Sequence, residues 1–164
     1  MGYLPSRLEI SVSNLLLQKG IKTPIDLQPK ILAERFNIDL QMSTTSFAYT
    51  DGNTKIILLN RRAGEKERNY EFHKLFSHIL LHSGNHLEMD SDQYRRQDKE
   101  AQELCCLEAI PYHMLRFIDF SNKHFITQAS ERFRIPEKIV ETRIQFMVRK
   151  QLTQSIKEQI KSFA

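Results

Sequence analysis

The chain has 164 residues, of which 40% are hydrophobic, and this is enough for one compact domain with a buried core and excludes a fibrous or disordered protein. No apolar run approaches the roughly 20 residues needed to cross a bilayer, and the N-terminus lacks a basic region leading into an apolar one, so we expect a cytoplasmic protein. The net charge of +4 permits a nucleic acid or an acidic protein as partner without requiring either.

The N-terminal 37 residues predict two amphipathic helices. Apolar residues recur at helical spacing from about residue 8 to residue 19, and Gly20 follows where a helix C-terminus favours glycine. Thr23 and Pro24 then open a second helical pattern, which Asn37 ends.

Three short β-rich segments follow these helices. Residues 38–42 and 46–49 alternate between apolar and polar side chains, and residues 55–60 form a short apolar run. Residues 51–53 are Asp-Gly-Asn, which is a strong turn signal. We therefore expect a small antiparallel sheet between the N-terminal helices and the middle of the chain.

A histidine-rich helix is predicted at residues 70–82, after an exposed charged loop at 61–68. Its apolar residues share one face at the spacing of a buried helix: Phe72, Leu75, Phe76, Ile79 and Leu80. Lys74, His78 and His82 stand four apart on the neighbouring face.

The rest of the chain is predicted to be helical. A polar stretch at 86–96 is expected to be a loop over the site, and residues 98–107 form a helix that Pro111 stops. Residues 112–120 form a further short helix. Two helices at 127–133 and 137–149 then make a hairpin, and a polar helix ends the chain.

The two cysteines, Cys105 and Cys106, are adjacent and therefore poorly placed to pair with each other. They fit a reducing compartment as small hydrophobic residues within a helix.

The hairpin over residues 126–147 has the apolar spacing of a DNA-binding helix-turn-helix, which an ordinary helical hairpin also needs. Glu137 and Glu141 would face phosphates unfavourably, whereas Lys138 and Arg143 would help. Because the charge is mixed, the sequence favours a structural hairpin over DNA binding.

Four histidines within fourteen positions, His73, His78, His82 and His86, suggest a metal site or the remnant of one. The zinc-peptidase pattern, two histidines four apart with a glutamate directly after the first, is absent. A zinc site would need a third ligand from elsewhere, and Glu100 is the best-placed candidate, although it could equally be a carboxylate at a helix N-terminus.

Five segments together match the pattern of a known family: Gly-Ile-Lys-Thr-Pro-Ile-Asp-Leu at 20–27, the turn and strand before the central helix, His-Ile-Leu-Leu-His-Ser-Gly-Asn at 78–85, Glu-Ala at 100–101 followed by Ala-Ile-Pro at 109–111, and the helical residues 133–143. Through these segments the chain resembles the ImmA/IrrE-type metallopeptidases. The resemblance implies an α+β, mainly helical, zincin-like domain at residues 1–120 with a C-terminal helical hairpin at 121–164. It also implies a bacterial, intracellular protein, often encoded by a prophage or another mobile element, that cleaves a transcriptional repressor.

The chain departs from the family pattern at the residues that carry the chemistry. When the family's second zinc histidine is placed on His78, its first falls on Lys74 and its catalytic glutamate on Leu75. The resemblance makes Glu100 the third ligand. His78 and Glu100 would then be remnant ligands, and two protein ligands hold zinc poorly. His82 or His73 are possible substitutes.

The leading hypothesis is a relative without catalytic activity and without zinc, in which Lys74 balances the Glu100 carboxylate and the protein binds a repressor or a similar regulator. The alternative is a zinc endopeptidase with a shifted site, made of His78, Glu100 and either His73 or His82, with Glu71 as a conceivable base. A helix-turn-helix DNA-binding regulator is a third hypothesis.

Overall fold

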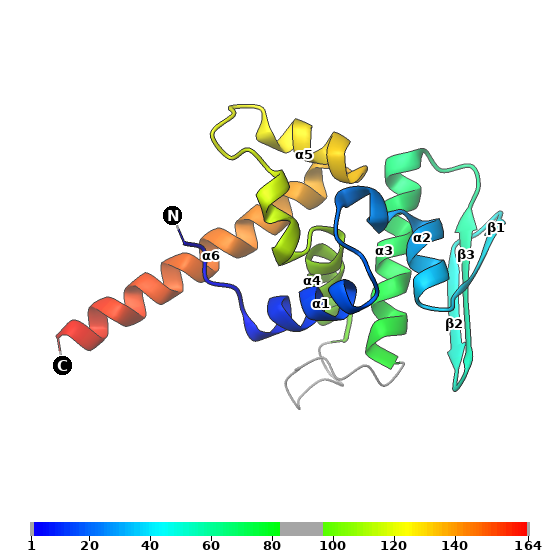
Figure 1. The fold of residues 1–164 in the computed structure, drawn as a ribbon, viewed down its shortest axis with the longest axis horizontal. Coiled ribbons are helices and arrows are strands. Elements are labelled where there is room, and N and C mark those ends of the chain that lie inside the picture. Colours follow the sequence, from blue (N-terminus) through cyan, green and yellow to red (C-terminus); the bar gives the residue numbers. More distant parts are fainter. Residues whose placement is uncertain (1, 83–96, 164) are drawn as a thin grey trace.

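The computed structural model describes residues 2–82 and 97–163, without the side chains of residues 97–100. The elements follow one another as α1 (Arg7–Gln18), η1 (Pro24–Leu27), α2 (Pro29–Arg35), β1 (Asp39–Ser43), β2 (Phe47–Asp51), β3 (Thr54–Asn60), α3 (Glu65–His82), α4 (Gln97–Ala109), η3 (Tyr112–Phe117), α5 (Phe125–Phe133) and α6 (Glu137–Ser162), of which η1 and η3 are 3-10 helices. The fold is α+β and mainly helical, as predicted (Figure 1).

The first helix, α1, is set by its capping residues. Ser6 accepts a hydrogen bond from the Glu9 amide, and the Glu9 carboxylate accepts one from the Ser6 amide, which together make a capping box. Gly20 follows the helix with a φ of +76°, the left-handed conformation that glycine adopts without strain. The first predicted helix is therefore confirmed.

The second predicted helix is divided into two. The 3-10 helix η1 is followed by α2, and Gln28 between them is extended. The physical reason is Pro29, since the residue before a proline is disfavoured in the helical region. Proline then occupies the first turn of α2, where its missing N–H costs nothing.

The sheet is mixed, so the prediction of an antiparallel sheet was wrong in one of its two pairings. The strand order is β1-β3-β2, with β2 antiparallel and β1 parallel to β3. After β1, the connection passes the end of β3 instead of turning back beside β1. Two hydrogen bonds hold that crossing, from the Arg61 amide to the Ser43 carbonyl oxygen and from the Asn60 amide to Ser46 Oγ.

Helix α3 begins at Glu65, so the prediction of an exposed loop as far as residue 68 was wrong. The charged residues at 65–68 form its first turn, where Glu65 and Glu67 interact favourably with the helix dipole. They lie on the exposed or half-exposed surface, so no apolar periodicity reveals this turn.

Helix α3 is the central element of the fold. It contacts β2 and β3 on one side and α4 on another, and Figure 1 shows it between the sheet and α4. Its predicted face is buried at Phe72, Phe76, Ile79 and Leu80, and Leu75 is partly buried against the same core. Cys105 and Cys106 are buried in α4 as free thiols, as predicted.

The C-terminal hairpin turns at Arg134, which has a left-handed φ of 54°. Its second helix, α6, continues without a break to Ser162 and extends beyond the body of the molecule (Figure 1). Among the described helices, none is both long and apolar enough to span a membrane.

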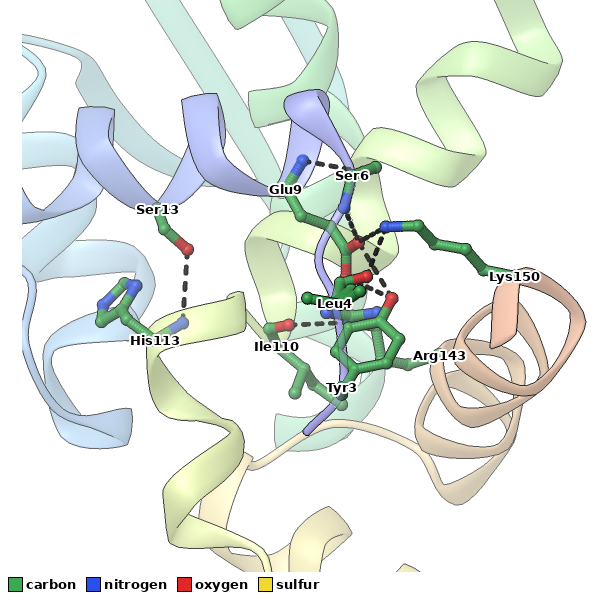
Figure 2. A network of polar contacts seen from close by, with 9 residues as sticks. All are labelled: Tyr3, Leu4, Ser6, Glu9, Ser13, Ile110, His113, Arg143 and Lys150. Carbon is green, nitrogen blue, oxygen red and sulfur yellow. Dashed lines mark hydrogen bonds and ion pairs between the residues drawn. The ribbon is translucent and has the colours of Figure 1, made fainter. Parts of the chain in front are cut away.

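A buried polar network fastens α6 to α1 (Figure 2). Arg143 is fully buried, and its Nη2 donates to Glu9 Oε1 at 2.7 Å while its Nε donates to the Ile110 carbonyl oxygen at 2.9 Å. The Tyr3 hydroxyl also donates to Glu9, and Lys150 Nζ lies 3.6 Å from Glu9 Oε2. The network therefore links both ends of the chain to its centre.

Candidate functional site

The predicted site residues at 74–82 lie on α3. Lys74 is exposed on this helix, and its ammonium lies 5.1 Å from the centre of the Tyr70 ring. That distance is typical of a cation–π contact. The Lys74 side chain therefore lies at the surface, in contact with its own helix.

Leu75, the next residue, is partly buried and packs against the hydrophobic core. An aliphatic side chain can neither accept a proton from water nor bind a metal. The position where the resemblance places a general base is thus part of the apolar packing.

His78 and His82 stand on one face of α3, as their spacing predicts. Their rings are nearly parallel, with centres 6.5 Å apart and planes 4° apart. His78 is half-buried, whereas His82 is exposed. The two imidazoles are therefore the described side chains of the predicted site that retain metal-binding chemistry.

His73 lies elsewhere, in the interior between α3 and α4. Its Nδ1 is 2.6 Å from Glu108 Oε2, and both side chains are at most 1% exposed. Ser77 Oγ donates to the His73 carbonyl oxygen at 2.9 Å and lies 3.3 Å from Glu108 Oε1. His73 is therefore already paired with a carboxylate in the core.

Burial raises the pKa of Glu108, while the neighbouring His73 and the hydroxyl of Ser77 act in the opposite direction. A serine, a histidine and a glutamate in contact resemble the parts of a hydrolytic triad. All three side chains are buried, however, so a substrate has no access to them. These three residues are therefore a structural contact between α3 and α4.

Glu71, the conceivable base, faces the sheet. Its Oε2 accepts a hydrogen bond of 2.5 Å from Ser46 Oγ, and Ser46 in turn accepts one from the Asn60 amide. The carboxylate therefore joins α3 to the strand crossing.

Zinc is the metal that the resemblance implies, and the described side chains do not fit it. Within residues 2–82 and 101–163, no three histidine, cysteine or acidic residues converge as a metal site would require. Lys74 and Leu75 offer no ligand, and His73 is committed to Glu108. Glu100 belongs to α4 by its backbone, whereas its side chain and the whole of His86 lie outside the described residues.

The cysteines add no reactive group. Burial raises the pKa of Cys105 well above its usual value and that of Cys106 to about 12. Both thiols therefore stay protonated at neutral pH and behave as small apolar residues.

Glu108 and Glu9 hold buried contacts that were not predicted from the sequence. Glu108 stands within Leu-Cys-Cys-Leu-Glu-Ala-Ile, and a carboxylate inside such an apolar run is a signal of a buried, paired charge. Glu9 follows Ser6 by three residues, which is the spacing of a capping box, but nothing local identifies Arg143 as its partner.

Comparison with known proteins identifies the family of the chain. The sequence profile of the IrrE N-terminal-like domain matches residues 30–145. The chain is also similar to the "Uncharacterized protein YqaB" of Bacillus subtilis (strain 168), with 28% identity over 159 residues, which covers 95% of this chain and 92% of that protein. No solved structure matches significantly. Because the profile spans most of the chain, this protein belongs to the IrrE N-terminal-like domain family.

Proposed function

We propose that this chain is a member of its family without peptidase activity, which acts in the cytoplasm as a binding factor for a transcriptional repressor or a similar regulator. The observation that carries the proposal is the pair Lys74 and Leu75. A cation contacting Tyr70 and an aliphatic residue of the core occupy the two positions where the family resemblance places a zinc ligand and a general base.

The chemistry of these two residues argues against hydrolysis. A catalytic zinc site has three protein ligands and one open position for water. A protonated lysine cannot donate a lone pair, and loss of a positioned base typically costs a factor of 10² to 10⁴ in rate. With the fold kept and these groups changed, binding is the function that can persist.

Metal analysis of the chain, purified without chelators, tests the first part of the proposal. We expect far less than one zinc per chain and no cleavage of a candidate repressor in the presence of added zinc. Stoichiometric zinc that is lost in His78→Ala, together with a zinc-dependent cut, would overturn the proposal.

Restoring the family residues provides a sharper test of the same site. The double variant Lys74→His with Leu75→Glu would place two histidines four apart with a glutamate between them. We expect this variant to bind zinc and the wild type not to. The matched control is His82→Ala in the double variant, which should keep the zinc if His78 and Glu100 are the inherited ligands.

The partner is tested by affinity capture from the organism that encodes the chain, using the intact protein as bait. We expect a transcription regulator to be recovered uncut. Capture that recovers no regulator in repeated experiments, with a known partner pair as a positive control, contradicts this part of the proposal.

A zinc endopeptidase with a shifted site is the second candidate, and the stacked His78 and His82 favour it. It requires Glu100 as a further ligand and another base, for which Glu71 is a candidate. Zinc that is lost in both His78→Ala and His82→Ala would support this alternative over the proposed binding factor.

A further inference from the structure

The second half of α6 carries an apolar stripe that the rest of the described chain does not cover. Its members share large exposed fractions: Val148 51%, Leu152 59%, Ile156 54%, Ile160 64% and Phe163 91%. Scattered exposed apolar residues are normal on a protein surface, but a contiguous row on one helix marks an interaction site.

The spacing places the five side chains on one face. Each residue turns an α-helix by about 100°, so the stripe from Val148 to Phe163 spans an arc of about 120°. Figure 1 shows that this half of α6 extends away from the other elements. The buried residues of α6, Ile139, Val140 and Arg143, all belong to its first half.

The N-terminal segment contacts another face of the same helix. Lys150 Nζ donates to the Leu4 carbonyl oxygen at 2.6 Å, and a cavity between the two segments is lined by Leu4, Gln151, Gln154, Ser155 and Glu158, among others. On a helical projection, the α6 residues of this group lie outside the apolar arc. The chain's own contacts thus leave the stripe open.

The charges around the stripe suit a second copy of the same chain. Gln159 lies within the arc and Thr153 and Ser155 border it, and all three are uncharged, whereas Lys150, Lys157 and Lys161 lie on the opposite side of the helix. Arg149 is the one charged residue of 148–163 within the arc, so an acidic partner would find a single cation beside the apolar residues. We propose that the chain forms a symmetric dimer in which two α6 helices pack antiparallel through this stripe.

In an antiparallel pair, apolar residues of one helix face apolar residues of the other. With Ile156 on the twofold axis, Leu152 faces Ile160 of the second copy, and Val148 lies within one residue of the level of Phe163. Arg149 then lies far from its symmetry mate. A parallel pair would bring the two Arg149 side chains together at the edge of the stripe, which is unfavourable.

The exposed area of the stripe limits how strong the interface can be. From their exposed fractions, the five side chains present on the order of 500 Å² per copy. Two copies therefore bury at most on the order of 1,000 Å² through these residues, which is below the roughly 1,200 Å² of standard interfaces and fits a weak dimer.

The mass of the intact protein in solution tests the dimer. Light scattering or sedimentation should give twice 19.4 kDa at roughly micromolar to 100 µM concentrations. Ile156→Lys should return the mass to that of one chain, because it places two like charges on the axis. Gln154→Lys is the matched control, since it adds the same charge outside the stripe, and it should remain dimeric.

Disulfide trapping tests the register. Cys105 and Cys106 are buried, so an introduced thiol is the reactive one. Ile156→Cys should form a covalent dimer with an oxidant, and Gln154→Cys should not. Val148→Cys should cross-link to Phe163→Cys when the two variants are mixed, and poorly to itself.

The outcomes separate the possibilities. A monomer throughout the concentration range overturns the proposal, whether or not the stripe then binds another protein or a vesicle. A dimer that Ile156→Lys leaves intact overturns it as well. Circular dichroism of each variant distinguishes loss of the interface from unfolding. The result is independent of the zinc and partner experiments, so either proposal can fail alone.

Discussion

At the scale of single residues, the described part of the chain contains two buried pairs of ionisable side chains, and each pair joins elements that are distant in sequence. His73 and Glu108 link α3 to α4, and Glu9 and Arg143 link α1 to α6. A buried pair is costly to break, because removing one partner leaves the other without compensation. The same pair can often be replaced by apolar residues without loss.

The first pair, His73 and Glu108, should therefore be more costly to break than to replace. His73→Leu and Glu108→Leu should each lower the free energy of unfolding by roughly 3–5 kcal/mol. The double variant should be more stable than either single variant, because neither side chain of the pair is then left without its partner. Ser77 keeps its hydrogen bond to the carbonyl oxygen of residue 73, since that oxygen belongs to the backbone. Urea unfolding of the wild type, the two single variants and the double variant measures this double-mutant cycle. A double variant that is less stable than both single variants contradicts the prediction.

The second pair makes stability depend on pH. Burial of Glu9 raises its pKa, but Arg143, the Ser6 amide and the Tyr3 hydroxyl outweigh this effect and lower the pKa below the usual 4.5. The ionised carboxylate therefore stabilises the fold above pH 4.5, and this contribution is lost as the pH falls through the lowered pKa.

Glu9→Gln should accordingly cost roughly 3 kcal/mol near neutral pH, because Arg143 stays charged and buried. The difference from the wild type should shrink as the pH falls below the pKa of Glu9. Denaturant unfolding across this pH range is the measurement. Glu34→Gln, which removes an exposed carboxylate, is the control and should change stability by less than about 0.5 kcal/mol at every pH.

At the scale of elements, the C-terminal hairpin contains a strained turn. Arg134 ends α5 in the left-handed conformation, which costs an ordinary side chain about 1 kcal/mol or more. Its backbone carbonyl oxygen accepts a hydrogen bond from the Asn69 side chain, and a substitution at residue 134 keeps this oxygen. Its guanidinium is 3.3 Å from Glu65 in an exposed ion pair, which contributes little.

Arg134→Gly should therefore raise the free energy of unfolding by about 0.5–1 kcal/mol, because glycine adopts this φ without strain. Arg134→Ala loses the same ion pair and keeps the strain, so it should be neutral or slightly destabilising. Comparing the two variants by thermal or urea unfolding isolates the backbone effect. Equal stability of the two would show that strain at this residue is negligible.

The helices were easier to predict from the sequence than the strand pairing. Apolar periodicity predicted α1, the buried face of α3 and the apolar residues of α4, because burial imposes the pattern. It missed the first turn of α3, which is exposed, and the parallel pairing of β1 with β3, which depends on how a three-residue connection crosses β3. Local sequence carries no signal of that crossing.

For the site, the sequence predicted which residues share a helix face but not which side chains pair. His78 and His82 are neighbours as their spacing requires. His73 was considered as a replacement ligand, and the structure pairs it with Glu108, 35 residues away. Such a long-range partner follows from the packing of α3 on α4 and has no counterpart in the spacing of histidines along one helix.

At the scale of the whole molecule, α6 combines two roles in one continuous helix. Its first half belongs to the core through Ile139, Val140 and Arg143, whereas the described residues from 151 onward are exposed or half-exposed. Within the described chain, the distal half meets the N-terminal segment but adds no buried side chain to the core. Contacts with another molecule would therefore add to its stability.

If two chains associate through the stripe, the thermal unfolding midpoint of the wild type should rise with protein concentration, because association is linked to folding. Deleting residues 155–164 removes Ile156, Ile160 and Phe163 while keeping Lys150 and its contact with Leu4. The shortened chain should remain folded, and its midpoint should be independent of concentration. Calorimetry or circular dichroism over a hundredfold concentration range measures both. A concentration dependence that survives the deletion would place the interface on another surface, and a shortened chain that fails to fold would show that the distal helix stabilises the monomer itself.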